Sequence, residues 1–276
     1  MLITDLRRYL RRTGLDPNRR LGQNFLINSS IASRIAAEIP GQGSVLEIGP
    51  GFGSLTEKLL PRSESLSVVE ISDRMALFLR QRFSGERLNV IRADFLEVDP
   101  SELPAYPFMT VVGNLPYYIS SPIIFRMIEH SFRHVQKAVL MLQREVAVRL
   151  STLDGGKDYG KLSLQIWPVF TVEDLIDVSA EDFYPVPGVL SRVVVLNRRS
   201  NPLISEELYG RFRKIVKVSF AMRRKTIFNN LKPLLGKDGA LKLLEMSDVD
   251  PCHRAEQLPP ERFVKMAEAM PGENHL

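Results

Sequence analysis

The sequence predicts an α/β fold, in which helices cover a parallel sheet, followed by a small all-helical domain. From residue 44 onward, short apolar runs alternate with segments of helical periodicity, which is typical of βαβ units. Beyond residue 200 only helical periodicity remains. Between the two regions lies the polar stretch 198–202, which ends in the turn signal Asn-Pro. We therefore predict one domain at residues 1–200 and a helical domain at residues 201–276.

Each predicted element rests on its own pattern. The strands are short apolar runs bounded by turn residues: Ser44–Ile48, Leu66–Glu70, Leu88–Arg92, Met109–Gly113, Ala138–Leu142, Phe170–Val178 and Val189–Leu196. The helices predicted between them lie near Ser54–Leu60, Asp73–Phe83, Ser121–His130 and Arg144–Leu153. Residues 54–57, Ser-Leu-Thr-Glu, have the spacing of a capping box at the start of the first helix.

The composition is that of an ordinary globular protein, with 44% hydrophobic and 25% charged residues among 276. No apolar stretch approaches the roughly 18 residues that a membrane span needs. The amino terminus also lacks the apolar core of a secretory signal. The single cysteine, Cys252, can form neither an internal disulfide nor a cysteine-based zinc cluster. These features predict a cytoplasmic protein without membrane contact, and a monomer is the default expectation.

Positive charge is concentrated at the two ends of the chain. The net charge is +5; residues 1–20 hold six Arg against two Asp, and residues 201–276 hold 13 basic against 10 acidic residues. The middle of the chain is therefore slightly acidic. By itself this distribution favours neither a polyanion partner nor a merely solvated surface. An organelle transit sequence is a further interpretation of the Arg-rich start, but the acidic residues that interrupt it weigh against this.

The stretch 211–225 contains seven basic residues and no acidic one. At about 100° per residue, one sector of roughly 120° collects most of them: Arg213, Lys214, Lys217, Arg224 and Lys225. Apolar side chains occupy the opposite side, so we predict a single helix with one face for a core and one for anions. Together with Arg223, these residues are predicted to bind nucleic acid. A plain surface helix is the alternative, although such helices usually mix both charge signs.

A glycine-rich turn follows the first predicted strand. Residues 47–53 read Glu-Ile-Gly-Pro-Gly-Phe-Gly, which lets the backbone turn tightly and approach a ligand at a helix amino terminus. Glu70 ends the second strand, where a carboxylate can accept hydrogen bonds from a ribose diol. Both NAD and S-adenosylmethionine carry that ribose. The G-x-G-x-G spacing differs from the G-x-G-x-x-G of dinucleotide binders and favours S-adenosylmethionine.

Polar side chains end two further strands. Asp94 follows the third strand, where its carboxylate could accept the amino group of a cofactor adenine beside Phe95, and Asn114 follows the fourth. Caps of helices or turns explain any one of these positions, but not readily all of them. Together with the glycine-rich turn and Glu70, they predict a Rossmann-like class I S-adenosylmethionine methyltransferase domain.

The tetrapeptide that begins at Asn114 reads Asn-Leu-Pro-Tyr and lies where ligands bind in parallel sheets. The Asn114 side-chain oxygen and the Leu115 carbonyl, whose direction Pro116 restricts, could each accept one hydrogen of an exocyclic amino group. Tyr117 could stack on the attached base. Such a grip would turn the nitrogen lone pair toward an electrophile. The alternative is an ordinary solvent-exposed turn.

These motifs resemble the ribosomal RNA adenine dimethyltransferase family, which includes the bacterial small-subunit enzyme linked to kasugamycin sensitivity. The resemblance covers the chain from about residue 19 to its end, with the motifs in the family's order. The matching segments are Leu21–Leu26, Glu47–Gly51, Asn114–Tyr117, Tyr159–Ser163, Phe183–Ser191 and Phe220–Thr226.

The resemblance implies dimethylation of two adjacent adenosines at N6, near the 3′ end of small-subunit (16S) rRNA in a partly assembled 30S particle. It implies cofactor contacts at Asn24, Leu26, Gly49, Glu70, Asp94 and Asn114, to which the glycine-rich turn adds Gly51. The predicted catalytic set is Asn114, Leu115, Pro116, Tyr117 and Phe183. Gly188 and Leu190 stand where many relatives have Lys and Asp, so the RNA contacts of that loop are open.

Other functions and roles are open as well. A non-catalytic RNA-binding assembly factor, a DNA adenine methyltransferase and a large-subunit rRNA methyltransferase are rivals; Leu115, where the DNA enzymes usually have Pro, weighs against the second. Phe183, a stacking candidate in a loop stiffened by two prolines, has the alternative of a core aromatic ahead of a strand. His130 and His134 have a metal-compatible spacing on a predicted helix, but no third ligand is in view, so no metal site is predicted.

Overall fold

The computed structural model describes residues 10, 23–41, 43–104, 107–108 and 110–270. Contacts divide the chain into two compact units. The first comprises Met1–Ala147 and Val172–Arg198, and the second Val148–Thr171 and Arg199–Leu276. The segment Val148–Thr171 thus groups with the helical unit, although the sequence analysis places it in the first domain. The six arginines of the amino-terminal arm lie outside the described residues.

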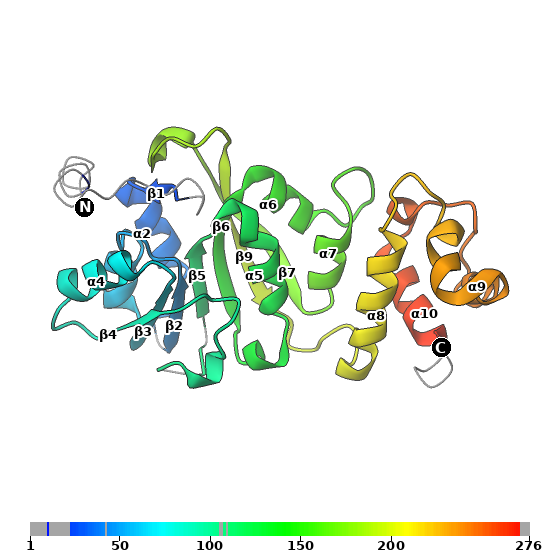
Figure 1. Ribbon diagram of the computed structural model, residues 1–276, viewed down its shortest axis with the longest axis horizontal. Helices are drawn as coiled ribbons and strands as arrows, with labels where there is room; N and C mark the ends of the chain where they lie inside the picture. Colours follow the sequence, from blue (N-terminus) through cyan, green and yellow to red (C-terminus); the bar gives the residue numbers. More distant parts are fainter. Residues whose placement is uncertain (1–9, 11–22, 42, 105–106, 109, 271–276) are drawn as a thin grey trace. The chain divides into compact units, whose positions relative to one another are not determined.

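The first unit is built on a seven-stranded sheet with the order β4-β3-β2-β5-β6-β9-β7 (Figure 1). Its strands are β2 (Ser44–Ile48), β3 (Ser65–Glu70), β4 (Leu88–Arg92), β5 (Thr110–Asn114), β6 (Lys137–Gln143), β7 (Phe170–Val178) and β9 (Ser191–Arg198). All pairs from β4 to β6 are parallel, and β9 runs antiparallel to β6. The predicted α/β fold is confirmed; Met109, the predicted start of β5, lies outside the described residues.

The order of the strands places the strand-end motifs side by side. The chain runs outward from β2 through β3 to β4, and then returns to add β5 on the other side of β2. Such a reversal opens a crevice at the carboxyl ends of the two central strands. Ile48 of β2 is in register with Gly113 of β5. The glycine-rich turn after Ile48 and the tetrapeptide that begins at Asn114 therefore emerge next to each other.

Helices pack on this sheet through apolar faces. They are α2 (Ser29–Ala37), α3 (Thr56–Leu59), α4 (Asp73–Arg82), α5 (Ser120–Arg126) and α6 (Arg144–Ser151). Ile31 and Ile35 are four residues apart and so lie on one face of α2, where they join a buried cluster with Val45 and Val112 of the sheet. No helix in the described part of the chain is long and apolar enough to cross a bilayer.

The capping box predicted at residues 54–57 is wrong. Helix α3 begins at Thr56, and its N-cap Leu55 has helical backbone angles and no side-chain cap. The Thr56 hydroxyl donates instead to Glu47 Oε2 at 2.6 Å. Contacts with the neighbouring strand, and not a local cap, shape the start of this helix.

A small second sheet has no counterpart in the sequence analysis. Strand β1 (Phe25–Leu26) pairs antiparallel with β8 (Phe183–Tyr184), with Leu26 opposite Phe183. The pairing continues into side chains, because Asn28 Nδ2 donates to Asp182 Oδ1 at 2.7 Å. The segment ahead of the first central strand is thus attached to the segment ahead of β9.

The second unit contains α7 (Lys161–Ile166), α8 (Glu206–Ser219), α9 (Ile227–Met246) and α10 (Pro260–Ala269). Helix α9 is kinked at Gly236, which has a φ of 72°. The core of the unit includes the rings of Tyr159, Phe212, Phe220 and Phe263. Tyr159 is fully buried, and its hydroxyl donates to the Leu258 carbonyl at 2.9 Å. This explains why the segment around Tyr159 groups with the helical unit.

Two predicted helices end earlier than the sequence analysis expects. Helix α8 ends at Ser219, so the single helical face predicted across residues 211–225 is wrong. Asn230 accepts from the Met222 N–H and donates to the Met222 carbonyl, both at 3.1 Å, which fixes a non-helical connection. Helix α5 ends at Arg126, and His130 lies in a separate 3₁₀ turn, so the helical spacing predicted for His130 and His134 is also wrong.

Candidate active site

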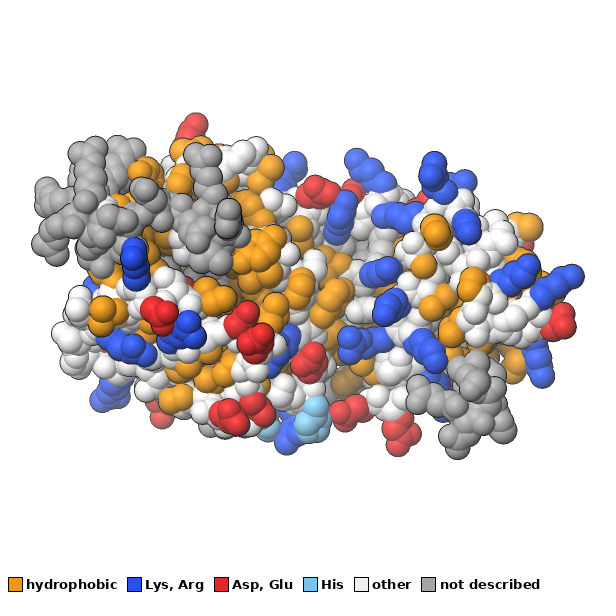
Figure 2. Space-filling model, in the orientation of Figure 1, with side chains coloured by type: hydrophobic (Ala, Val, Ile, Leu, Met, Phe, Trp, Pro, Cys, Tyr) orange, Lys and Arg blue, Asp and Glu red, His pale blue; other side chains and the backbone are white. Residues whose placement is uncertain are grey.

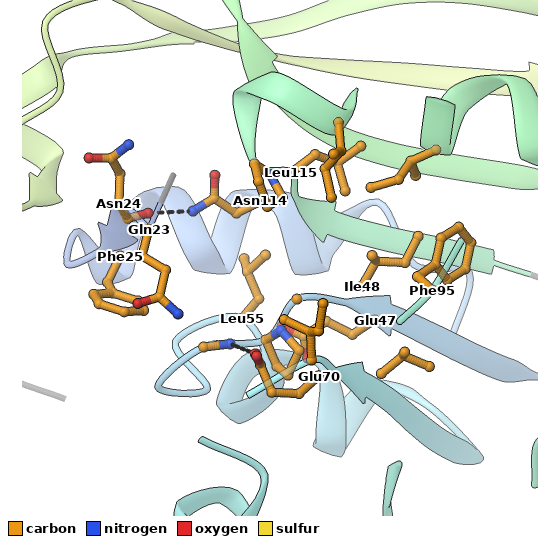
Figure 3. Close-up of a pocket in the computed structure, with 18 of the residues that line it drawn as sticks. Gln23, Asn24, Phe25, Glu47, Ile48, Leu55, Glu70, Phe95, Asn114 and Leu115 are labelled. Atoms are coloured by element: carbon orange, nitrogen blue, oxygen red, sulfur yellow. Dashed lines mark hydrogen bonds between the residues drawn. The ribbon is translucent and has the colours of Figure 1, made fainter. Parts of the chain in front are cut away.

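A pocket opens where the central strands end (Figure 3). Its empty space, including the part open to solvent, is about 990 Å³. All the predicted cofactor residues line it, namely Asn24, Leu26, Gly49, Gly51, Glu70, Asp94 and Asn114, and so do Leu115, Pro116 and Tyr117. Of the predicted catalytic residues, Phe183 alone is not part of the lining.

The glycine-rich turn forms one wall through a backbone that favours glycine. Gly49 and Gly51 have φ values of 63° and 56°, in the left-handed region. A Cβ on Gly51 would lie 2.9 Å from the Phe25 ring, whereas a Cβ on Gly49 would meet nothing within 4 Å. The wall is therefore close-packed behind Gly51, and the space beside Gly49 is open to a ligand.

Glu70 is held at the end of β3 by backbone donors. Its Oε2 accepts from the Gly51 N–H at 3.2 Å, and its Oε1 accepts from the Ser72 N–H at 2.9 Å. Burial raises the pKa of Glu70, and these hydrogen bonds oppose the increase. Because each carboxylate oxygen has a further lone pair, Glu70 can also accept from the two hydroxyls of a ribose.

The two carboxylate oxygens of Asp94 differ in their hydrogen bonds. Oδ1 accepts from the Leu96 N–H at 2.9 Å, which is the turn-capping alternative of the sequence analysis. Among the described residues Oδ2 has no hydrogen-bond partner, so it is available to an amino group. Phe95 lines the pocket beside it and is 5% exposed.

The orientation of the Asn114 amide follows from its neighbour. Asn114 Nδ2 donates to the main-chain oxygen of Asn24 at 2.8 Å (Figure 3). Since a carbonyl oxygen can only accept, the NH₂ end must face Asn24, and Oδ1 is the end left for another donor. Next along the chain, the Leu115 N–H donates to the Met141 carbonyl of β6 at 3.1 Å, which extends the ladder of β5 up to Pro116.

Tyr117 is half-buried and tied to a distant strand. Its hydroxyl is 2.9 Å from Ser191 Oγ at the start of β9, and Ser191 is fully buried. Burial raises the pKa of Tyr117, so the phenol stays protonated at neutral pH. Sequence reasoning assigned no role to Ser191, since 74 residues separate it from Tyr117 and no local pattern links the two.

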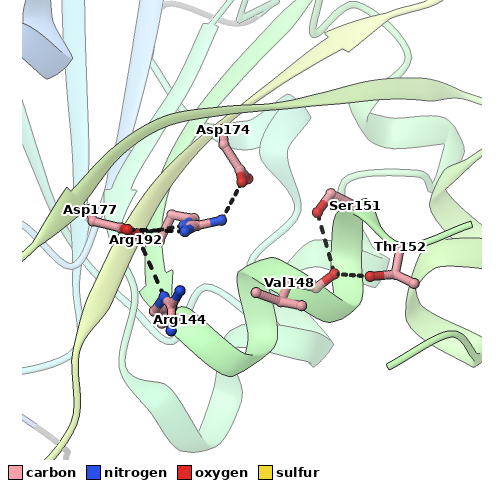
Figure 4. A network of polar contacts seen from close by, with 7 residues as sticks. All are labelled: Arg144, Val148, Ser151, Thr152, Asp174, Asp177 and Arg192. Atoms are coloured by element: carbon pink, nitrogen blue, oxygen red, sulfur yellow. Dashed lines mark hydrogen bonds and ion pairs between the residues drawn. The ribbon is translucent and has the colours of Figure 1, made fainter. Parts of the chain in front are cut away.

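A salt-bridge network holds the start of β9 (Figure 4). Arg192 binds Asp174 and Asp177 of β7, and its Nε is 2.6 Å from Asp177 Oδ1. Arg144 approaches the same Asp177 oxygen at 4.0 Å. The strand that carries Ser191 therefore has a fixed position against β7.

Glu47 is a pocket residue to which sequence reasoning gave no role of its own. It is 1% exposed, and burial raises its pKa to about 8. The hydrogen bond from Thr56 opposes this increase, and the nearby Glu70 adds to it. Glu47 is thus a carboxyl group that is mainly protonated at neutral pH in the folded protein.

Phe183 lies in the core of the first unit. It is 1% exposed and packs in the cluster that contains Leu26 and Ile35. Pairing of β8 with β1 turns its side chain inward, which is the core alternative of the sequence analysis. A stacking role for Phe183 stays a prediction that this position does not favour.

The predicted RNA-binding residues all lie in the helical unit, whose visible face in Figure 2 carries many Lys and Arg side chains. Arg213, Lys214 and Lys217 are on α8, and Arg223, Arg224 and Lys225 are in the connection to α9. Arg223 pairs with Glu256 at 3.0 Å and donates to the carbonyls of Gly156 and Tyr159. Arg224 and Lys225 are exposed and form no ion pair within the described part of the chain.

Comparisons with solved structures support this reading of the fold. A 23S rRNA methyltransferase, ErmE, is 30% identical with a TM-score of 0.68, over 89% of this chain and 99% of that one. A dimethyladenosine transferase from Plasmodium falciparum is 28% identical with a TM-score of 0.75, over 88% of this chain and 95% of that one.

Curated relatives match over nearly the whole chain. The ribosomal RNA small subunit methyltransferase A of Acidithiobacillus ferrooxidans is 41% identical, over 91% of this chain and 93% of the relative. The protein of the same name from Geobacillus sp. is 36% identical, over 96% of this chain and 95% of the relative. The family model described as ribosomal RNA adenine dimethylase matches residues 14–271. With a family model that matches most of the chain and relatives of this identity and coverage, the chain belongs to the ribosomal RNA adenine dimethylase family.

Proposed function

We propose that the protein dimethylates N6 of two adjacent adenosines near the 3′ end of small-subunit rRNA, with S-adenosylmethionine as methyl donor. The observation that carries the proposal is the orientation of the Asn114 amide at the end of β5, which leaves Oδ1 to accept from a donor in the pocket that Asn114 and Leu115 both line. Relatives named for the small subunit, at up to 41% identity, support that substrate. Large-subunit rRNA, the substrate named for the 30% identical ErmE, is the alternative.

The residues that line the pocket fit S-adenosylmethionine. Glu70 offers acceptors for the ribose diol, Asp94 Oδ2 an acceptor for the adenine amino group, and the open space beside Gly49 room for the rest. When bound, this cofactor supplies an electrophilic methyl group on a sulfonium ion. Glu70 and Asp94 thereby orient the donor, and the tetrapeptide orients the acceptor.

The tetrapeptide makes the adenine amino group a better nucleophile. That nitrogen reacts poorly because its lone pair is delocalised into the ring. In the first transfer one N–H donates to Asn114 Oδ1 and the other to the Leu115 carbonyl, so the nitrogen is favoured in a pyramidal form whose lone pair faces the methyl group; in the second transfer the one remaining N–H keeps one of these bonds. Positioning of this kind can lower a barrier by several kcal/mol without a covalent step. The methylated nitrogen is cationic and loses its proton readily, so no strong general base is needed.

The target base must leave its stack to reach this wall. Extrusion costs a few kcal/mol. Stacking on an aromatic ring returns about 1–3 kcal/mol per base. Tyr117 lines the pocket next to the acceptors, and its hydroxyl is fixed by Ser191, so its ring is the platform for the target adenine.

The two predicted domains have different roles, methyl transfer in the first and RNA binding in the second. Residues 1–200 carry the transfer chemistry, and residues 201–276 bind RNA through Arg213, Lys214, Lys217, Arg224 and Lys225. The partner is a partly assembled 30S particle, which the protein meets as a monomer in the cytoplasm, where these particles form. The excess of basic over acidic residues in the tail supports this assignment.

Transfer of labelled methyl groups tests the proposal. The protein is incubated with labelled S-adenosylmethionine and unmethylated small-subunit particles, large-subunit particles or duplex DNA, and the modified bases are mapped. Label at paired adenosines of the small-subunit RNA is expected. Label confined to large-subunit particles or DNA would establish one of the rival functions, and absence of label from all three would favour a binding factor.

Substitution of Asn114 tests the mechanism. Asn114→Ala removes an acceptor that acts on the reacting nitrogen, and we expect a loss of about 100- to 1,000-fold in kcat, the usual effect of deleting one preorganised hydrogen bond. The matched control is Asn197→Ala, which removes an amide of β9 that is hydrogen-bonded to Glu173. Turnover of Asn114→Ala at the wild-type rate, with folding confirmed by thermal melting, would overturn the mechanism.

A further inference from the structure

Two consecutive tyrosines at the pocket have opposite environments. Tyr117 is half-buried, and its hydroxyl is held by Ser191 at 2.9 Å. Tyr118 also lines the pocket, yet it is 57% exposed. Within the described part of the chain its hydroxyl makes no hydrogen bond. Tyr118 therefore lies at the mouth of the pocket, where its ring is accessible from solvent.

The local backbone gives the two rings different directions. Tyr117, Tyr118 and Ile119 form a 3₁₀ turn. With three residues per turn, consecutive side chains point about 120° apart around the axis. The two rings cannot both stack on the same face of one base. If Tyr117 faces the target adenine, Tyr118 faces a different group.

An uncharged apolar loop is connected to the same edge of the pocket. Residues 185–190, Pro-Val-Pro-Gly-Val-Leu, join β8 to β9, and Val186, Val189 and Leu190 are 63%, 44% and 50% exposed. Both ends of the loop are attached to pocket residues. Tyr184 pairs with Phe25 before it, and Ser191 bonds to Tyr117 after it. Three exposed apolar side chains within six residues, in a loop attached at both ends to pocket residues, offer a patch that a partner could cover.

We propose that Tyr118 stacks on an unpaired nucleotide next to the target adenosine, with the loop 185–190 excluding water beside it. This inference rests on the proposed function, because an adenine that leaves its stack exposes a face of its neighbour. Single-stranded nucleotides in RNA are commonly bound by stacking on aromatic rings. Since every base offers such a face, Tyr118 contributes affinity for the unstacked strand without selecting the neighbour's identity.

The first test is a set of substitutions at Tyr118, with methyl transfer to unmethylated small-subunit particles as the readout. Tyr118→Ala should lower kcat/KM by about 10- to 100-fold, the loss expected for one base–aromatic stack. Tyr118→Phe should retain activity within about twofold, because the hydroxyl has no hydrogen-bond partner among the described residues. Affinity for S-adenosylhomocysteine, measured by calorimetry, should be unchanged in both variants. Leu77→Ala, which alters a similarly exposed apolar residue outside the pocket lining, is the matched control.

The second test removes the base on which Tyr118 would stack and leaves the tyrosine in place. Particles are reassembled with RNA that carries an abasic nucleotide on the 5′ or the 3′ side of the target pair. One of the two should reduce kcat/KM for the wild type by about as much as Tyr118→Ala does, and the substitution should add no further loss on that RNA.

Three results would overturn the inference. The first is a kcat/KM for Tyr118→Ala equal to that of the wild type, and the second is a loss of affinity for S-adenosylhomocysteine in Tyr118→Ala as large as its loss of kcat/KM. The third is that the losses caused by Tyr118→Ala and by the abasic nucleotide add on both RNAs. The second of these would assign Tyr118 to the cofactor. In each case the wild type would still methylate intact particles, whereas failure of the proposed function would abolish that reaction itself.

Discussion

Tyr117 and Ser191 form a single hydrogen bond that joins the tetrapeptide Asn114–Tyr117, the proposed catalytic segment, to the start of β9. A neutral hydrogen bond contributes about 0.5–1.5 kcal/mol. We therefore expect Ser191→Ala to lower kcat for methyl transfer by about 3- to 10-fold, because the Tyr117 ring would lose its fixed orientation. Calorimetry with S-adenosylhomocysteine should show unchanged affinity.

A double-mutant cycle separates this positioning role from a general loss of structure. Tyr117→Phe breaks the same bond from the other side, so the double variant should lose no more kcat than the larger single effect. Ser191→Thr keeps a hydroxyl and should recover part of the rate. Losses that add, or melting temperatures that fall in proportion to kcat, would contradict the role of Ser191.

Glu47 gives the stability of the first unit a distinct pH dependence. Its pKa is raised by burial to about 8, whereas an unfolded chain has a value near 4.5. The folded state therefore holds more protons between these values, and the free energy of unfolding should fall as pH rises from about 4.5 to about 8. The slope from this group is at most about 1.4 kcal/mol per pH unit.

Chemical denaturation of the wild type and Glu47→Gln between pH 5 and pH 8 tests this dependence. Glutamine has the same shape but does not titrate, so the wild type should lose stability relative to the variant as pH rises. If the free energy of unfolding changed with pH in the same way for the two proteins, Glu47 would have an ordinary pKa in the folded state.

At the scale of elements, Asn28 connects helix α2 to strand β8, which follows Asp182. Its side-chain oxygen accepts from the N–H groups of Ser30 and Ile31 as the N-cap of α2, and its amide nitrogen donates to Asp182. Asn28→Ala should lower the free energy of unfolding by about 1–2 kcal/mol, the cost of a lost cap, plus the contribution of the second bond.

The matched variant Asn28→Ser keeps a capping oxygen but cannot reach Asp182 as a donor in the same way. Asn28→Ser should therefore lose only the part of the free energy of unfolding that comes from the bond to Asp182. The difference in stability between the two variants then gives the contribution of the cap. Equal destabilisation by both substitutions, in denaturant titrations at constant pH, would mean that the cap contributes nothing.

At the scale of the whole molecule, charge on the helical unit should control binding to RNA. The double substitution of Arg224 and Lys225 to Ala removes two exposed cations, so it should weaken binding to small-subunit particles. It should also reduce the slope of log affinity against log salt by about 1–2. Binding curves at several KCl concentrations provide the measurement.

Arg223 is the internal control for this prediction. It bonds to Glu256 and to the carbonyls of Gly156 and Tyr159, so Arg223→Ala should lower the melting temperature of the helical unit and leave the salt slope close to that of the wild type. From sequence alone, Arg223 is predicted to bind RNA together with Arg224 and Lys225. A salt slope that changes only with Arg223 would reverse these assignments.

The sequence by itself determined the α/β sheet and which polar residues end its strands. Buried parallel strands are continuous apolar runs, and their carboxyl ends meet at one edge, so Glu70, Asp94 and Asn114 could be placed together from the order of the strands alone. Only the tertiary structure decided which atoms of these side chains are hydrogen-bonded within the protein and which are left for a ligand. The Asn114 amide is oriented by Asn24, which is 90 residues away in the chain.

Contacts that local sequence patterns do not show also explain where the rest of the structure differs from the predictions. Phe183 is turned into the core by pairing with Leu26, and α8 ends at Ser219 because Asn230 fixes the next turn. The capping box predicted at residues 54–57 does not form, because α3 begins at Thr56, whose hydroxyl bonds to Glu47. At Phe183 and Thr56, contacts that exist only once the chain has packed override what the local sequence predicts. Local patterns fix where elements form, and packing fixes which side chains face the pocket.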